Sequence, residues 1–260
     1  MSLPRAWSSA ATAVSPAGSG RRPELVALPG GLPTVAELFT FARDAELRFD
    51  TLRARIEERT QSARGERLVV TELAIRHPGL ARTLTSEPAL GTAANYEIWV
   101  TDGRMIRVYS AQHGRATERP VRNRVRGLDD GDVPAASRVY EPLTMLAEPS
   151  VANTIIHPAG FCQNVLSTGD CRVTGTTSVA GRQAIVLECR PPRTAPLAGD
   201  RPDYAIEVAF DRRDGAILRL VESIGAAVAR EVSVVAYDTD VAVPDATFEL
   251  AVPEGTTLLY

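Results

Sequence analysis

Three turn signals, each placed between two apolar-rich stretches, constrain the fold of this chain most strongly. They are Asp102-Gly103, Ala180-Gly181 and Asp214-Gly215. A short Gly-containing turn between runs of alternating apolar and polar residues predicts a β-hairpin, and Asp-Gly is the strongest such signal. Because hairpins that follow one another with short connections form a meander, we expect an antiparallel sheet.

The first of these hairpins, EIWVTDGRMIRVYS (97–110), has large apolar side chains on both faces. Ile98 and Val100 share one face of the first arm, and Trp99 points the other way. On the second arm, the side chains of Ile106 and Tyr109 point to opposite faces. Each face therefore has to lie against a protein core, a ligand or both, and the sequence leaves open which face lines the interior.

The chain divides into an arm and one ordered unit. Residues 1–33 are rich in Ser, Ala, Pro, Gly and Arg without an apolar period, which predicts a disordered arm. This arm contains no continuous apolar stretch of the kind found in signal peptides, and no run in the chain is long enough to cross a membrane. Residues 34–260 contain no linker, and we expect them to form a single domain.

The first ordered element is predicted to be an amphipathic helix over 35–50. Thr34 and Glu37 have the spacing of a capping box, and apolar residues recur after them at steps of three and four. From 52–60 onward the apolar period falls to two, which is typical of strands. Prolines interrupt the segment 134–160, where we expect one or two short helices among roughly ten or eleven strands.

Composition and motifs exclude several kinds of chemistry. All 29 Lys and Arg positions are arginine, so the chain has no phosphate-loop lysine and no lysine for a Schiff base. It contains no nucleophile-elbow, zinc-protease, dinucleotide-binding or EF-hand motif, and its three histidines are far apart. We therefore expect neither an enzyme nor a cofactor or metal site. The net charge of −3 gives the molecule no overall attraction to nucleic acid.

The three cysteines leave alternatives open. Cys162 and Cys171 flank a Ser-Thr-Gly-Asp turn, and a bridge between them would indicate an oxidising compartment. Three reduced thiols, with Cys189 in the core, are the alternative. A zinc site that uses His157 and the cysteines lacks the paired spacing of structural zinc sites.

Arginines alternate with valines in VRNRVRG (121–127), so Arg122, Arg124 and Arg126 would share one face of a strand. A solvated edge of the sheet explains this pattern. The functional alternative is contact with lipid headgroups or with an acidic partner.

The order of these segments resembles that of the LolA-like lipoprotein carriers, the LolB-like receptors and the RseB/MucB-like periplasmic sensors. The similarity extends over about 34–256 as short matches rather than one diagnostic motif. The matching residues are Arg76, Pro78, Arg82, Asp102, Gly103, Tyr109, Val179, Gly181, Arg182, Asp211, Gly215, Leu218, Arg219, Pro244, Phe248, Pro253 and Gly255.

The resemblance implies an α+β fold in which a strongly curved antiparallel sheet, an incomplete barrel, is closed by the N-terminal helix and the short mid-chain helices. It also implies an apolar cavity between sheet and helices for the acyl chain of a lipid or lipoprotein, and a site of action outside the cytoplasm. The alternative within the same group is a regulatory sensor that binds a membrane-anchored protein partner. The expected cavity residues are Val69, Leu73, Ile75, Ile98, Val100, Ile106, Val108, Leu143, Met145, Leu146, Ile185, Leu187, Ile206, Val208, Leu218 and Leu220.

Overall fold

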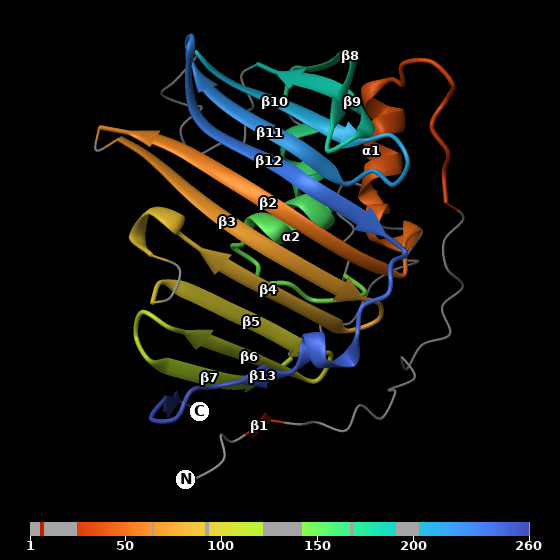
Figure 1. The fold of residues 1–260 in the computed structure, drawn as a ribbon. Helices are drawn as coiled ribbons and strands as arrows, with labels where there is room; N and C mark the ends of the chain where they lie inside the picture. Colours follow the sequence, from red (N-terminus) through yellow and green to blue (C-terminus); the bar gives the residue numbers. More distant parts are fainter. Residues whose placement is uncertain are drawn as a thin grey trace.

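The computed structural model describes residues 6–7, 25–63, 65–91, 94–121, 142–166, 169–190 and 203–259. Its main feature is one curved sheet of 12 strands in the order β14-β7-β6-β5-β4-β3-β2-β12-β11-β10-β9-β8 (Figure 1). Neighbouring strands are antiparallel apart from the parallel pair β14 and β7. Since β14 and β8 stand at opposite ends of this order, the sheet is not closed.

The sheet consists of two meanders joined by the long strands β2 and β12, which pair along most of their length. The strands are β2 (Thr51–Ser62), β3 (Gly65–Arg76), β4 (Leu80–Ser86), β5 (Tyr96–Asp102), β6 (Met105–Ser110), β7 (Arg115–Pro120), β8 (Cys171–Val179), β9 (Arg182–Cys189), β10 (Tyr204–Asp211), β11 (Ile217–Ile224), β12 (Ala227–Thr239) and β14 (Thr257–Leu259). A separate pair is formed by β1 (Ala6–Trp7) and β13 (Leu250–Ala251).

The three predicted hairpins are confirmed as β5–β6, β8–β9 and β10–β11. Gly103 has φ +81°, a conformation that favours glycine. A Cβ atom there would lie 3.3 Å from the Cα of Gly79 in the β3–β4 turn. Glycine at both positions therefore lets two neighbouring turns touch at one end of the sheet.

The predicted helix start is confirmed, whereas the helix is shorter than expected. The Thr34 hydroxyl accepts from the Glu37 N–H at 3.2 Å, and the Glu37 carboxylate accepts from the Thr34 N–H at 2.7 Å. The expected helix over 35–50 divides at Asp44 into the α-helix α1 and a 3-10 turn, η1, and this change of period keeps Leu47 buried. The helical elements are α1 (Val35–Arg43), η1 (Ala45–Arg48), η2 (Pro88–Leu90), α2 (Val151–Ile156), α3 (Ala159–Phe161), η4 (Cys162–Leu166) and η5 (Asp245–Phe248).

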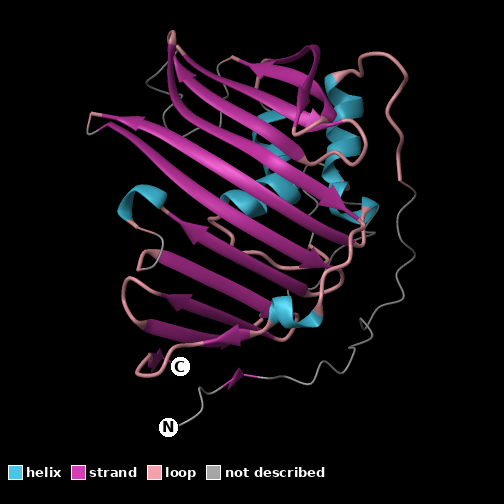
Figure 2. Ribbon diagram, viewed as in Figure 1, coloured by secondary structure: helices cyan, strands magenta, loops and turns pink. Residues whose placement is uncertain are grey.

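The strand register divides the sheet into two faces, because residues paired across strands point to the same side. We call inner the face that α1 and α2 cover; these helices lie behind the sheet in Figure 2. Its buried side chains form one cluster with Leu38 of α1 and Ile155 of α2. Members of this cluster from the sheet include Leu52, Leu73, Ile75, Trp99, Ile106, Ile185, Leu187, Ile206, Val208 and Leu220.

The outer face carries ion pairs and is covered in part by the end of the chain. Arg219 pairs there with Glu207 at 2.9 Å and Glu231 at 2.8 Å. Near β5 and β6, Leu250 and Val252 pack over Val100, Tyr109 and Ala116. The C-terminal segment therefore buries one part of the outer face.

Part of the predicted arm packs on the domain. Leu28 contacts the main core, and Arg212 donates to the carbonyl groups of Pro29, Gly30 and Gly31. Within the arm expected to be disordered, Leu28 and the segment Pro29–Gly31 thus have defined contacts with the domain. Residues 1–5 and 8–24 lie outside the described part of the chain.

Candidate ligand site between the sheet and its helices

Most of the predicted cavity residues lie on the inner face of the sheet or in the segment that covers it. The main core cluster contains Leu73, Ile75, Ile106, Leu146, Ile185, Leu187, Ile206, Val208, Leu218 and Leu220, with Val108 and Met145 packed against it. Val69 is buried on the inner face beside Glu58, and Leu143 is half-buried in the segment before α2. In this conformation these side chains pack against one another as ordinary core residues.

Ile98 and Val100, both among the expected cavity residues, face the outer side of the sheet. Their partners across the β5–β6 hairpin are Tyr109 and Arg107, whereas Trp99 is opposite Val108. Trp99 therefore joins the inner cluster, and Val100 joins the small outer cluster with Tyr109. The two-residue turn fixes which residues of the two arms pair. The sequence therefore already indicated that Ile98 and Val108 point to opposite faces.

The cover of the inner face consists of short separate pieces. Ile155 and Ile156 of α2 are fully buried against the sheet, together with Leu146 from the segment that precedes α2. α2 has six residues and begins at Ser150, whose hydroxyl accepts from the Asn153 N–H at 3.1 Å. A cover built from such short elements depends on its tertiary contacts for stability.

A cavity of about 220 Å³ lies at the edge of this cover. Leu47, Met145 and Leu146 supply its apolar lining, and Glu46 and His157 lie on its polar side. It is also lined by Arg43, Asp44, Pro142, Glu148, Asn153, Ala159 and Gly160.

A chain of polar contacts connects the cover to the rest of the molecule. His157 Nδ1 lies 3.3 Å from Glu46 Oε2, and its Nε2 lies 3.0 Å from the carbonyl oxygen of Thr144. The Thr144 hydroxyl is 2.7 Å from His77 Nδ1 and accepts from the Gly79 N–H at 2.8 Å. These residues are far apart in sequence and no motif spacing relates them, so sequence reasoning missed them.

Burial alone would raise the pKa of Glu46, because it disfavours the charged carboxylate. The neighbouring His157, with smaller contributions from His77 and the Leu143 N–H, outweighs burial and holds the pKa below its usual value. Glu46 is thus an ionised carboxylate in a buried place.

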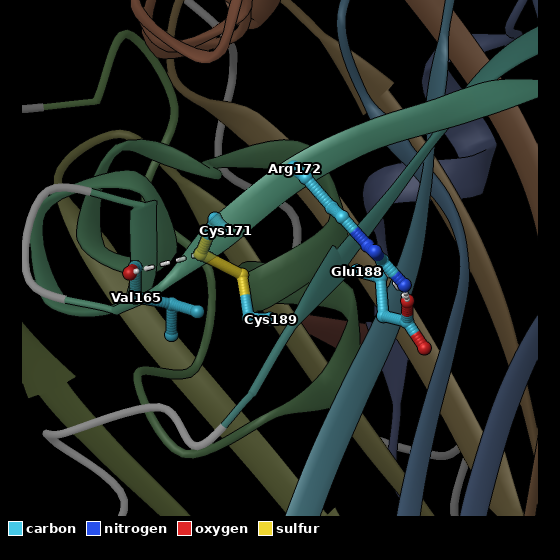
Figure 3. The surroundings of a disulfide bond; sticks show 5 residues. All are labelled: Val165, Cys171, Arg172, Glu188 and Cys189. Atoms are coloured by element: carbon cyan, nitrogen blue, oxygen red, sulfur yellow. Dashed lines mark hydrogen bonds and ion pairs between the residues drawn. A yellow bond between two sulfur atoms is a disulfide. The ribbon is translucent and has the colours of Figure 1, made fainter.

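Neither alternative for the cysteines, a bridge between Cys162 and Cys171 or three reduced thiols, agrees with the structure. Cys171 is bonded to Cys189, its direct partner across β8 and β9 (Figure 3). Cys162 is a free, buried thiol. The Cα atoms of the bonded residues are 4.1 Å apart, a separation that antiparallel pairing supplies. Burial raises the pKa of the Cys162 thiol to about 12, so this group is unreactive.

Two adjoining hollows lie on the outer face, with volumes of about 420 and 370 Å³. Both are lined by Arg55, Glu72, Arg82 and Leu84, so they form one shallow depression across the middle of the sheet. Ile98, which was expected inside the cavity, lines the larger hollow.

Arg122, Arg124 and Arg126 lie in 122–141, outside the described residues. Within the described ranges, His, Cys, Asp and Glu side chains do not gather in a group of three or more that could hold a metal ion. Nor does any helix in that part of the chain have the length and apolar character to span a membrane.

Neither the protein-family models nor the curated proteins contain a match to this chain. Among solved structures the chain is similar to MucB, with 15% identity and a TM-score of 0.47 over 84% of this chain and 62% of MucB. It thus spans less than two thirds of that protein. It is also similar to an uncharacterized conserved protein from Thermus thermophilus, with 11% identity and a TM-score of 0.46 over 86% of this chain and 98% of that one.

A LolA superfamily protein from Nitrosomonas europaea matches with 14% identity and a TM-score of 0.31 over 83% of this chain and 97% of its own. These three matches, at 11–15% identity, say what the chain is similar to and nothing about its function. Its function has to be inferred from its own residues.

Proposed function

We propose that the protein is a non-enzymatic binding protein that takes the acyl chain of a lipid or lipoprotein between the inner face and its helical cover. One observation carries this proposal: the middle of the inner face is apolar across both meanders, while its cover is made of short helices. Burial of each CH₂ group contributes about 0.8 kcal/mol, so an acyl chain needs no polar partner to bind. Leu187 and Val208 in the sheet and Met145 in the cover would contact it.

The mechanism is displacement of the cover. The apolar side chains of sheet and cover contact one another in the empty protein, so an entering chain replaces these contacts with its own. The exchange of one apolar surface for another costs little, because the sheet residues stay out of water throughout. The 220 Å³ cavity beside Met145 and Leu146 is the point from which the space would widen.

We place this activity outside the cytoplasm. The Cys171–Cys189 disulfide supports that assignment, since structural disulfides persist in oxidising compartments.

The test uses two matched substitutions on one hairpin. Val108 and Ile98 are both half-buried and lie on paired strands, but Val108 faces the inner side and Ile98 the outer. Val108→Arg should weaken the binding of a fluorescent long-chain fatty acid at least tenfold, whereas Ile98→Arg should leave it within about twofold. Thermal unfolding of both variants checks that each is folded.

Native mass spectrometry of the purified protein, followed by organic extraction, would identify any lipid already bound. If the folded wild-type protein takes up neither the fatty acid nor a lipid, the carrier proposal fails. Equal losses in two folded variants would also contradict binding at the inner face.

The second candidate is a regulatory protein that binds a membrane-associated partner, as in the sensor branch of the resemblance. The outer-face depression lined by Arg55, Glu72, Arg82 and Leu84 supports it, and Arg122, Arg124 and Arg126 remain candidates for contact with acidic groups. Here Ile98→Arg would weaken association and Val108→Arg would not. Attraction between arginines and an acidic partner would also fall steeply as salt is added.

A further inference from the structure

We propose that the outer face of the sheet carries a docking site for a segment of a partner protein in which an acidic side chain lies next to a large apolar one. The site is the outer-face depression, the two adjoining hollows that share Arg55, Glu72, Arg82 and Leu84. It lies on the other side of the sheet from the proposed acyl-chain site and does not depend on lipid binding. It also gives a chemical description of the partner that the second candidate function requires.

The outer-face depression extends across several strands of the sheet. In the strand register, Arg55 of β2, Glu72 of β3, Leu84 of β4 and Ile98 of β5 are direct neighbours in one row on the outer face. Neighbouring strands are about 4.8 Å apart, so this row spans about 14 Å. Sites for small molecules enclose most of the surface of their ligand, whereas a shallow depression of this extent suits a protein segment that lies across the strands.

The half-buried side chain of Arg82 distinguishes this depression from the rest of the outer face. Among the described residues, its guanidinium has one hydrogen-bond acceptor, the carbonyl oxygen of Glu249 at 3.2 Å, and it forms no salt bridge. Glu72 attracts it from a greater distance, but burial removes water from the charged form and lowers the pKa of Arg82. A guanidinium has five N–H donors, so Arg82 can still bind an incoming carboxylate with two of them.

Other arginines of the outer face have carboxylate partners. Arg59 pairs with Glu57 at 2.7 Å, Arg76 pairs with Asp245 at 2.6 Å, and Arg219 pairs with two glutamates. These side chains are neutralised within the molecule. A guanidinium that is half-buried in a hollow and lacks such a partner in the described part of the chain is a place where a carboxylate from another protein would bind.

The charges that line the depression sum to a positive surplus. They are Arg53 and Arg55 from β2, Glu72 from β3, Arg82 from β4 and Asp238 from β12. Arg55 pairs with Glu72 at 3.4 Å, and Arg53 lies opposite Asp238 in the strand register. These four charges balance, so Arg82 leaves one positive charge in excess. An acidic side chain of the partner complements it.

Apolar side chains beside Arg82 supply the second half of the recognition. Val70, Leu84 and Ile98 line the larger hollow together with Arg82. Arg82 and Leu84 are two positions apart on the same face of β4, which corresponds to about 6–7 Å. Two side chains of a partner meet this spacing when they are two positions apart in an extended segment, or three or four apart on a helix.

Fluorescence anisotropy of two labelled synthetic peptides, titrated with the whole chain, tests the docking site. One peptide alternates glutamate and leucine with a single serine between them, and the other has glutamine in place of glutamate. The wild-type protein should bind the glutamate peptide at least about tenfold more tightly, and this preference should fall as salt is added. Arg82→Gln should reduce the preference to about twofold or less, whereas Arg82→Lys, which keeps the positive charge, should retain most of it.

Arg219→Gln is the matched control, because Arg219 lies on the same face but already has carboxylate partners. This variant should keep the wild-type preference, and thermal unfolding shows that each variant is folded. The docking site is overturned if the wild type binds neither peptide, if it binds both equally, or if folded Arg82→Gln keeps the preference.

The fluorescent fatty acid separates this docking site from the acyl-chain site. If the glutamate peptide binds as described but the fatty acid does not bind, the carrier function fails and the docking site stands. If instead Arg82→Gln weakens the fatty acid and the wild type does not distinguish the peptides, the depression takes a free amphipathic carboxylate, and the protein partner is overturned.

Discussion

The two faces of the sheet are stabilised by different interactions. Inner positions such as Leu187 and Val208 are fully buried and apolar, and helices cover them. Outer positions carry salt bridges such as Arg55–Glu72 at 3.4 Å, with both side chains about half exposed. In the described part of the chain, the outer face has an apolar cover near β5 and β6, from the segment around Leu250, and at Ala74 of β3, from Val243 and Phe248.

This difference between the faces determines which substitutions should change the stability of the protein. Apolar burial contributes in proportion to the area removed from water, whereas exposed ion pairs contribute at most about 1 kcal/mol each. The inner face therefore supplies most of the stability and is also the proposed binding surface. The outer face can vary without large cost to the fold, which makes its variants suitable controls.

The largest expected effect comes from the inner face. Phe210 is fully buried, and its ring lies 6.1 Å from that of Phe161 in α3 between centroids. Phe210→Ala should lower the free energy of unfolding by about 3–5 kcal/mol, through lost burial and the cavity that remains. Urea denaturation measures this loss.

Val228 is the matched control from the outer side. It lies opposite Ser223 and is 44% exposed. Val228→Ala should change the free energy of unfolding by no more than about 0.5 kcal/mol. Similar losses for the two substitutions would break the distinction between the faces.

A smaller effect is expected at the edge of the sheet, where the disulfide holds β8 to β9. Cys171 and Cys189 are 18 residues apart, and loop-closure entropy for such a span corresponds to about 3 kcal/mol. The double substitution Cys171→Ser and Cys189→Ser should lower the free energy of unfolding by about this amount.

Mass mapping of the non-reduced protein provides the direct check on this pairing. It should yield a peptide that joins Cys171 to Cys189 and leave Cys162 to react with an alkylating agent only after unfolding. A peptide that joins Cys162 to Cys171 would contradict the observed pairing and support the bridge that the sequence left open.

The sequence predicted the features that depend on residues close together in the chain. The Thr34–Glu37 capping box and the three hairpin turns involve residues within a few positions of one another, and each was found as expected. The division of the expected helix at Asp44 was missed, because apolar spacing alone does not separate an α-helix from a 3-10 turn that continues it.

What the sequence did not predict depends on pairing between distant elements. Cys162 is nearer to Cys171 in the sequence, but the antiparallel register of β8 and β9 brings Cys189 to it. Glu46, His77, Thr144 and His157 come from four separate segments and meet only when the cover docks on the sheet. Sequence reasoning treated the histidines as isolated turn residues, which is how they appear without the fold.

The last prediction concerns a place where charged side chains are buried instead of exposed on the outer face. Asp211 and Asp214, 1% and 2% exposed, lie together at the turn between β10 and β11, although carboxylates elsewhere in the sheet favour the outer face. Arg182 pairs with both, at 2.8 Å to Asp214, and the Tyr237 hydroxyl donates to Asp214 at 3.3 Å. One guanidinium thus serves two buried carboxylates.

Burial, and then the charge of Asp211, raise the pKa of Asp214 to about 6. An acid whose pKa is raised by folding binds its proton more tightly in the folded state, so the free energy of unfolding should fall as the pH rises from about 4 to about 6. The contribution is on the order of 2 kcal/mol. Asp214→Asn should remove this part of the pH dependence, whereas Asp238→Asn, at an exposed outer carboxyl of β12, should retain it. Urea denaturation at about pH 4.5 and about pH 7 provides the comparison, and an Asp214→Asn profile parallel to that of the wild type would mean that Arg182 neutralises both carboxylates after all.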